Sequence, residues 1–440
     1  MAGGTDGTGD DGRTEDDGAT PGAAGRRAGR ARLLVGAVAG LALLGGGALL
    51  AAALLGGHPA RTAQSLRPDA GASTHPGASA GRGTAARPGT GHRRFTLVAT
   101  GDIIPYPSIV QRARDDAGGR GYDFRRILAG VKPVVHAADL AICHHEIPYG
   151  PSGGPFTGYP LFQAPQQLAR AIKDTGYASC STASNHTLDA GFQGLARTLD
   201  QLDLAGVRHT GSARTAAEAR RPALLTAGGA TVAQLSYTYG TNGIPLPDGK
   251  PWAVNVIDAE RILADARAAR RAGASVVVLS VHWGTEWQTA PDEQQRELAR
   301  RLTAARTDGL PDVDLIIGTH NHVPQPYEKV NGTWVVYGMG DQVASFYEAD
   351  KRRGNESSIP RFTFEPSAAH PGRFDVVKAE YLTQYSDMRG TFRVVCTSCA
   401  ATTSTAAEAD RREYAAVDAR VTDAVLSRGA AGQGLLRATR

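Results

Sequence analysis

Residues 258–284 read DAERILADARAARRAGASVVVLSVHWG and contain one helix followed by one strand. Asp258 is a good helix N-cap, the apolar residues after it recur at helical spacing, and Gly273 ends the helix. From Ala274 the chain is almost continuously apolar, which is typical of a strand buried on both faces. This strand ends at His282, so a side chain that can bind metal or move a proton stands at its carboxyl end.

The same helix–strand pattern extends over most of the chain. From Phe95 onward, short β-rich runs alternate with amphipathic helices. This alternation predicts an α/β domain with substantial parallel pairing over residues 95–396. Residues 361–396 lack helical periodicity, and we interpret them as a late hairpin layer of the same domain. We expect residues 397–440, rich in Ala and Arg, to form a C-terminal tail, either a surface helix or a frayed end.

The N-terminal part has a different composition. Residues 1–32 contain almost no apolar side chains and are predicted to be a disordered cytoplasmic segment. Residues 33–55 contain no charged or strongly polar side chain and are long enough to cross a bilayer, so we predict one transmembrane helix there. Arginines cluster before this helix, which places the rest of the chain outside the cytoplasm. We favour an uncleaved anchor over a signal peptide, followed by a flexible linker over residues 56–94.

Charge and cysteine content exclude some classes of protein. The formal net charge of +5 is small for 440 residues, so it favours contact with anionic lipid or polymer only weakly and gives no case for nucleic acid. Four cysteines are too few for a scaffold built from disulfides. For Cys396 and Cys399, which form a CxxC, we expect a local disulfide or two free thiols.

Residues of metal-binding type follow the carboxyl ends of five predicted strands. They are Asp102, Glu146, Asn185 with His186, His282, and His320 with His322. In open α/β sheets, ligands bind outside these strand ends. One such residue alone is usually a turn former or a helix cap, but five in corresponding positions are hard to explain by capping. Carboxylate, imidazole and amide ligands suit Mn²⁺, Fe²⁺ or Zn²⁺, and a pair of such ions can hold the oxygens of a phosphoryl displacement.

Two of these motifs allow a closer interpretation. In the segment His320–His322, alternation would direct both imidazoles to one side if the backbone stayed extended, within reach of two adjacent ions. Glu146 is the candidate for a carboxylate that bridges the ions. The pair Asn185 and His186 is either a turn with a helix cap or a metal ligand beside a general acid.

The motifs TGDIIP, ADLAICHHE, SNHTLDAG, VHWGTE and GTHNHVPQP, in this order, resemble the CapA family of poly-γ-glutamate capsule biosynthesis proteins. That family is related to the calcineurin-like metallophosphoesterases. The resemblance covers about Phe95 to Phe346 and extends through the hairpins to about residue 395. It implies a four-layer α/β/β/α sandwich of metallophosphoesterase type.

The resemblance also implies roles for the strand-end residues. It assigns ligands to two metal ions: Asp102 and His322 to one, Asn185, His282 and His320 to the other, with Glu146 between them. His186 would protonate the leaving oxygen or stabilise its charge. Asp189 would be a helix cap or would orient His186.

Two departures from the family pattern affect the site. The first phosphoesterase motif is Asp-x-His, but Asp102 is followed by two isoleucines, which leaves occupancy of the first metal position open. Relatives carry Asn-Leu before the glutamate, whereas this chain has His144 and His145. His144 either replaces the Asn in ligation or hydrogen bonding, or is a loop histidine. Further candidates for substrate contact or ligand support, each with a packing or loop role as the alternative, are Gln325, Trp283, Glu286 and Asp341.

Two functions follow from these expectations. One is an extracytoplasmic, membrane-anchored metallohydrolase that cuts a phosphoester or related bond during synthesis or export of an anionic polymer such as poly-γ-glutamate, beside other capsule-synthesis membrane proteins. The other is a non-catalytic scaffold that holds the polymer. Because a scaffold needs no proton donor, His186 favours the hydrolase.

Overall fold

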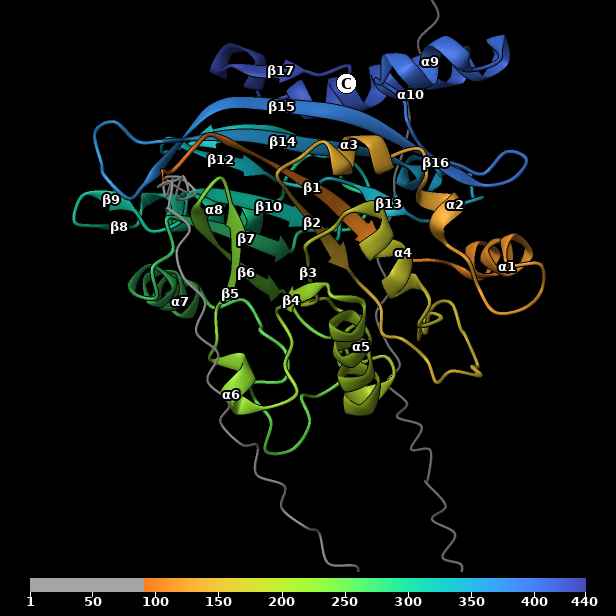
Figure 1. Ribbon diagram of the computed structural model, residues 1–440, viewed down its shortest axis with the longest axis horizontal. Coiled ribbons are helices and arrows are strands. Elements are labelled where there is room, and N and C mark those ends of the chain that lie inside the picture. Colours follow the sequence, from red (N-terminus) through yellow and green to blue (C-terminus); the bar gives the residue numbers. More distant parts are fainter. Residues whose placement is uncertain (1–90) are drawn as a thin grey trace, which may run out of the picture. The chain divides into compact units, whose positions relative to one another are not determined.

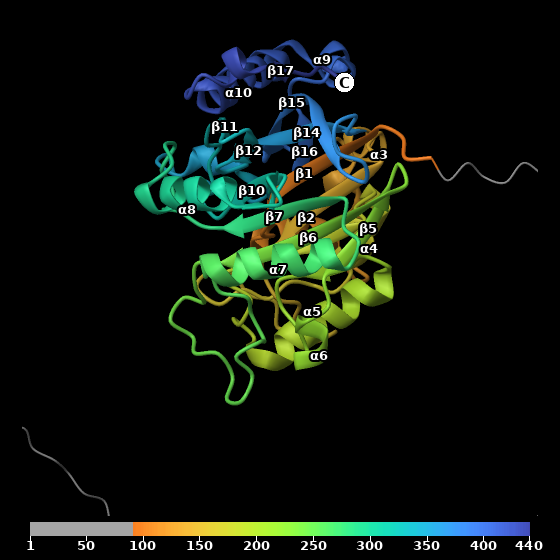
Figure 2. The same ribbon diagram turned by 90° about the vertical axis from the view of Figure 1, so that its left-hand side faces the viewer.

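The computed structural model describes residues 91–440 (Figures 1 and 2). The predicted disordered segment, the predicted transmembrane helix over residues 33–55 and nearly all of the predicted linker lie outside these residues. Within residues 91–440, no helix combines the length and apolar character that a membrane span requires.

The first of two large sheets has nine strands. Its order is β16-β15-β14-β1-β2-β3-β4, with β13 also paired to β1 and β17 to β15. The strands are β1 (Phe95–Ile103), β2 (Leu140–His145), β3 (Ser179–Ser181), β4 (Arg208–Thr210), β13 (Asp341–Val343), β14 (Glu356–Pro366), β15 (Phe374–Asp387), β16 (Arg393–Cys396) and β17 (Leu435–Arg437). Strands β1 to β4 are parallel, and β14 to β16 are antiparallel, as the alternating and hairpin patterns predict.

The second sheet has six strands in the order β11-β12-β10-β7-β6-β5. They are β5 (Ala223–Ala227), β6 (Ala230–Thr238), β7 (Val276–His282), β10 (Leu315–Thr319), β11 (Tyr327–Val330) and β12 (Thr333–Val336). Its four inner strands are parallel, and hairpins add β5 and β11 at the edges. A separate ribbon pairs β8 (Arg306–Thr307) with β9 (Leu310–Pro311).

The helices flank these sheets. They are α1 (Pro107–Asp116), α2 (Arg125–Leu128), α3 (Lys132–His136), α4 (Leu168–Thr175), α5 (Gly191–Ala205), α6 (Ala216–Ala219), α7 (Ala259–Arg271), α8 (Glu293–Ala304), α9 (Ala400–Thr405) and α10 (Glu408–Leu426), with the 3₁₀ turns η1 (Arg352–Asn355) and η2 (Ala430–Gln433). Figure 2 shows α7 along the outer face of β6 and β7.

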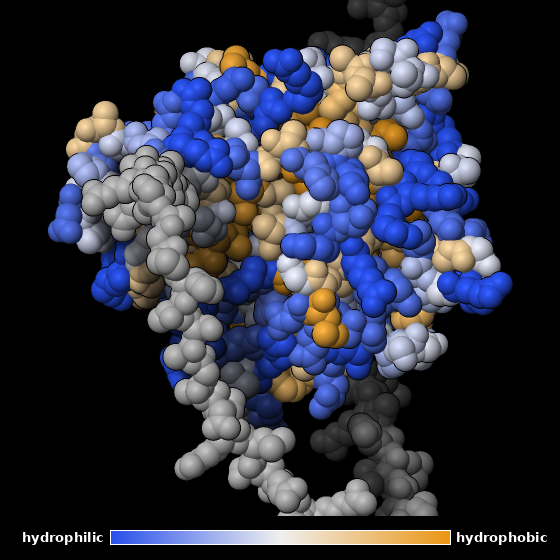
Figure 3. Space-filling model, viewed as in Figure 1, coloured by the Kyte–Doolittle hydropathy of each residue, from blue (hydrophilic) through white to orange (hydrophobic). Residues whose placement is uncertain are grey.

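Alternation along single strands produces four layers. In β7, Val276 and Val278 point into the core between the two sheets, whereas Val277 and Leu279 pack against α7 and α8. The outer face of β1 and β2 packs in the same way against α1, α2 and α4. Both faces of the central strands are therefore buried, which explains their uninterrupted apolar sequence. On the face that Figure 3 shows, hydrophilic residues predominate over smaller hydrophobic areas.

Residues 397–440, which we expected to form a tail, belong to the folded domain. Strand β17 pairs in parallel with β15, and Figure 1 shows α10 lying along β15. The buried residues Tyr414, Val417 and Val421 of α10 join the core between the sheets. Their spacing of three to four residues is an apolar helical stripe that the Ala- and Arg-rich composition obscured.

The described cysteines form two disulfides. Cys143–Cys180 joins the adjacent strands β2 and β3, and Cys396–Cys399 closes a local loop after β16. For the CxxC, the structure therefore has the disulfide, one of the two states that we expected.

Close backbone packing beside Asp102 yields a prediction. A Cβ at Gly101 would lie 1.7 Å from the carbonyl oxygen of Gly340, so Gly101→Ala must displace β1 or β13. We expect it to lower the free energy of unfolding by about 3 kcal/mol, measured by urea denaturation. Gly153→Ala is the control, because its Cβ would have no described atom within 4 Å. Equal stability of the two variants would contradict the close approach.

Candidate metal centre

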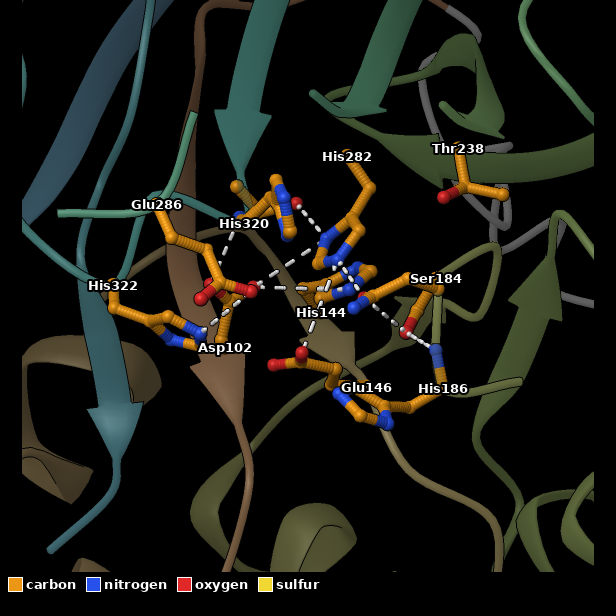
Figure 4. A network of polar contacts seen from close by, with 12 residues as sticks. Asp102, His144, Glu146, Ser184, His186, Thr238, His282, Glu286, His320 and His322 are labelled. Atoms are coloured by element: carbon orange, nitrogen blue, oxygen red, sulfur yellow. Dashed lines mark hydrogen bonds and ion pairs between the residues drawn. The ribbon is translucent and has the colours of Figure 1, made fainter. Parts of the chain in front are cut away.

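The carboxyl ends of the central strands of both sheets meet at one place (Figure 4). In the first sheet, Asp102 of β1 stands in register with His144 of β2. In the second sheet, His282 at the end of β7 stands in register with Thr319 at the end of β10. Because these strands are parallel, their terminal side chains lie at the same edge and face one another across the two sheets.

Several buried polar atoms at this edge have no hydrogen-bond partner among residues 91–440. They are Oδ1 of Asp102, Nε2 of His144, both carboxylate oxygens of Glu146 and Nδ1 of His320. Unpaired buried groups of this kind are costly unless a cation satisfies them. The ligand atoms of Asp102, His144 and His282, and those of Asp102, Glu146 and His322, lie within 4.8 Å of one another. The residues therefore fit divalent metal binding, with mixed oxygen and nitrogen ligands.

Hydroxyl groups orient two of the imidazoles. Nδ1 of His282 lies 2.9 Å from Oγ1 of Thr319, and Nδ1 of His144 lies 2.8 Å from Oγ of Ser181. Each Nε2 is left to face the cluster, as in metal sites where the outer nitrogen is held by a hydrogen bond. His144 is thus buried at the end of β2 and is not a surface loop residue. Burial, with His145 nearby, lowers the pKa of His144 to about 3, so this imidazole is neutral and can act as a ligand.

Asp341 supports His322, which is the one histidine of the cluster with a raised pKa. Nδ1 of His322 lies 3.0 Å from Oδ1 of Asp341. Burial alone would lower the pKa of His322, but Asp341, Glu146 and Asp102 together raise it to about 10. Burial raises the pKa of Asp102 and that of Glu146; repulsion from Asp341 adds to the effect at Asp102, and repulsion from Asp102 adds to it at Glu146. In the metal-free protein, several buried carboxyl groups therefore share one imidazolium.

The segment from His320 to His322 does not keep the extended backbone on which we based its geometry. Strand β10 ends at Thr319, and φ is 93° at His320 and 60° at His322. The two rings lie 6.3 Å apart, and His320 is close to His282, at 4.7 Å between ring centroids. The backbone N–H of His320 donates to Oδ2 of Asp102 at 3.0 Å, which ties this turn to β1. The turn thus sends the two imidazoles to opposite parts of the cluster.

Asn185 and His186 lie in different parts of the site. Oδ1 of Asn185 lies 2.7 Å from Nε2 of His282, inside the cluster. Nδ1 of His186 lies 2.7 Å from Oδ2 of Asp189, which also accepts the backbone N–H of Phe162. The N-cap of α5 is Ala190, so Asp189 orients His186 and does not cap the helix.

The remaining candidates separate into packing and site residues. Gln325 is fully buried; its Oε1 accepts a hydrogen bond from Nε2 of Gln295, and its Nε2 donates to the backbone oxygen of Gln288 in the loop between β7 and α8, so it makes loop hydrogen bonds. Trp283 is buried in the second sheet's outer core. Glu286 approaches Nε2 of His322 at 3.9 Å. Figure 4 shows it beside that imidazole.

Sequence reasoning missed two residues that follow β6. The ring of Tyr239 lies 4.5 Å from that of His320, and Oδ1 of Asn242 accepts a hydrogen bond from Nδ2 of Asn185. The signal was their position, because β6 pairs in parallel with β7 and Thr238 stands in register with His282. Only the sheet order makes that neighbour relation visible.

The raised pKa of His322 predicts a pH dependence of stability. A group whose pKa rises on folding stabilises the protein below its unfolded value, about 6.5 for His, and that stability is lost as pH approaches the folded value of about 10. We expect the free energy of unfolding of the metal-free protein to decrease as pH rises from about 6.5 to about 10, by at most about 1.4 kcal/mol per pH unit. Urea denaturation in a chelator measures it.

Two variants make this test specific. His322→Gln removes the titrating imidazole, so the unfolding free energy should change less with pH. His370→Gln, at an exposed position, should leave this pH dependence unchanged. A slope that survives in His322→Gln would show that other groups cause it.

Comparisons with known proteins show the family of this chain. Residues 96–345 match the family described as bacterial capsule synthesis protein PGA_cap. PGA biosynthesis protein CapA of Bacillus subtilis (strain 168) is 26% identical over 250 residues, which are 56% of this chain and 62% of that protein. A probable polyglutamine synthesis accessory protein of Mycobacterium tuberculosis is 32% identical over 182 residues, 38% of this chain and 45% of that protein. The chain thus spans less than two thirds of these curated relatives.

Solved structures with similar folds include phosphoesterases. The calcineurin-like phosphoesterase YfkN from Bacillus subtilis has 16% identity and a TM-score of 0.40, over 67% of this chain and 91% of that one. A 5'-nucleotidase precursor from Thermus thermophilus has 18% identity and a TM-score of 0.39, over 66% of this chain and 54% of that one. The family match covers more than half of the chain with the strand-end motifs inside it, and this protein belongs to the bacterial capsule synthesis family PGA_cap.

Proposed function

We propose that this protein is a membrane-anchored, extracytoplasmic hydrolase that uses two divalent ions to cut a phosphoester or related bond during capsule synthesis or export. The anionic polymer of that pathway would be poly-γ-glutamate or a similar chain, and other capsule-synthesis membrane proteins would be partners. Family membership and the names of the similar proteins support the capsule role.

The observation that carries the proposal is the position of His186. It lies at the edge of the ligand cluster and lines a hollow that also reaches His322. Asp189 holds Nδ1 of His186, which leaves Nε2 for a group bound in the hollow. His186 belongs to neither group of converging ligand atoms, so its oriented imidazole is available to act as a general acid.

The other site residues have complementary tasks. Asp102, Glu146, Asn185, His144, His282, His320 and His322 would hold the ions. Bound ions of this kind would supply Lewis-acid stabilisation of the charge that develops on the reacting oxygens. His186 would then donate a proton from Nε2 to the leaving oxygen, and Asp189 would hold the ring in position for that transfer.

The disulfides support an extracytoplasmic location. Cys143–Cys180 and Cys396–Cys399 are both paired, and such bonds persist in oxidising compartments and are rare in the cytosol. The apolar segment over residues 33–55, with arginines before it, supports an anchor that leaves the domain outside.

Substitution of single histidines tests the proposal. We expect the Mn²⁺-loaded protein to hydrolyse bis(4-nitrophenyl) phosphate, and His186→Ala to lower kcat by about 10²- to 10⁴-fold while metal content is retained. His282→Ala should lose metal as well as activity, because His282 lies inside the cluster. Metal content is measured by mass spectrometry beside the rates.

The control is His136→Ala, since His136 is exposed on α3 and bonds only the backbone oxygen of Asp174. If the unaltered protein binds no metal and hydrolyses neither monoesters nor diesters, the polymer-holding scaffold is favoured. A His186→Ala variant with full activity would remove His186 from the mechanism.

A further inference from the structure

Exposed aromatic rings gather around the candidate site. Three aromatic side chains of residues 91–440 are exposed: Tyr159 at 78%, Tyr347 at 64% and, less so, Tyr239 at 38%. Tyr159 and Tyr347 line the hollow beside His186, and Tyr239 packs on His320 at the other side of the cluster. Because an exposed aromatic ring contributes nothing to the core, this clustering points to ligand binding.

Four segments contribute aromatic side chains to the walls of the hollow, which has a volume of about 350 Å³. Tyr106 comes from the segment between β1 and α1, Tyr159 and Phe162 from the segment between β2 and α4, Trp287 from the loop after β7, and Tyr347 from the loop after β13. A volume of this order is typical of a small-ligand site.

The walls are continuous with the proposed reaction centre. The ring of Trp287 stacks on that of His322 at 5.1 Å, and Phe162 meets His186 edge-on at 4.9 Å. A group that reacts at the ligand cluster would therefore place its substituent between these aromatic walls.

The charges of the hollow disfavour a polyanion. Glu286 and Glu348 contribute carboxylates, whereas the cationic groups are Lys351 and His322, whose Nδ1 is already held by Asp341, and no arginine lines the hollow. The Nζ of Lys351 lies 5.5 Å from the ring centroid of Trp287, so the ammonium rests on the aromatic wall. A chain with a carboxylate on every residue would meet like charge here. Ligands with several O–H donors would instead find acceptors in both glutamates.

We propose that the hollow binds an uncharged, hydroxyl-bearing sugar ring of the substrate, so that the bond cut is in a sugar phosphate and not in the polyanionic chain itself. Cleavage of a sugar phosphate rests on the proposed hydrolase function, whereas binding of the sugar ring does not. A sugar ring can pack its C–H faces on Tyr159 and Tyr347 while the hydroxyls around its edge donate to Glu286 and Glu348. A planar base would stack equally well but has fewer donors for two carboxylates.

The first experiment tests whether the hollow binds a sugar ring, without any reaction. Saturation-transfer NMR on the full-length, Mg²⁺-loaded protein would use methyl α-glucopyranoside, with adenosine and tri-γ-glutamate as comparison ligands. We expect transfer to the glucoside, and a dissociation constant raised about tenfold or more in the double variant Tyr159→Ala, Tyr347→Ala, which removes two ring contacts. The matched control is Leu204→Ala, which alters a side chain 78% exposed on α5 and outside the hollow.

The second experiment tests which bond is cut, by measuring rates of ester hydrolysis by the Mn²⁺-loaded protein. We expect kcat/KM for glucose 1-phosphate to exceed that for glycerol 3-phosphate about tenfold, with the advantage lost through KM in the double tyrosine variant. If the glucoside binds but no ester is hydrolysed, the proposed function fails and the sugar site stands. The inference is overturned if esters are hydrolysed without glucoside binding or ring preference. Tighter binding of adenosine or tri-γ-glutamate than of the glucoside would also overturn it.

Discussion

The structure depends on one electrostatic constraint, which is the burial of carboxylates where two sheets meet. Asp102 and Glu146 are almost completely buried, and three of their four oxygens lack a hydrogen-bond partner among the described residues. Burial opposes their ionised forms, and proximity adds repulsion between them. A bound cation or a retained proton relieves both effects, so the metal-free centre relies on the His322 imidazolium and on protonated carboxyl groups.

That constraint explains why so many neighbouring groups are hydrogen-bonded to the ligands. Thr319 and Ser181 hold imidazole rings through Nδ1, and Asp341 does the same for His322. The N–H of His320 fixes one oxygen of Asp102. These contacts come from strands of both sheets, so the relative position of the two sheets determines the ligand geometry. The core between the sheets, which includes α10, is therefore part of what keeps the centre assembled.

The surroundings of the centre divide its chemistry between two sides. On one side, His186 with Asp189 presents an imidazole nitrogen to the hollow, and aromatic loops enclose the space beyond it. On the other, Asn185 is held by Asn242, and Tyr239 covers His320. The proposed proton donor, His186, therefore lies on the side where a substituent has room. This arrangement supports a reaction at the hollow, with support of the candidate ligands on the other side.

The sequence by itself determined the helix–strand alternation, the parallel strands, the late hairpins and the positions of the strand-end ligands. These features are local, because caps, apolar runs and strand ends are set by neighbours in the chain. Asp102, Asn185 and His282 could thus be named before their contacts were known. The tertiary structure alone decided the rest. Tyr239 and Asn242 reach the site because β6 lies beside β7, and the turn at His320 depends on a hydrogen bond to Asp102, 218 residues away. Pairing order and long-range hydrogen bonds join distant segments, and no local pattern records which segments those are.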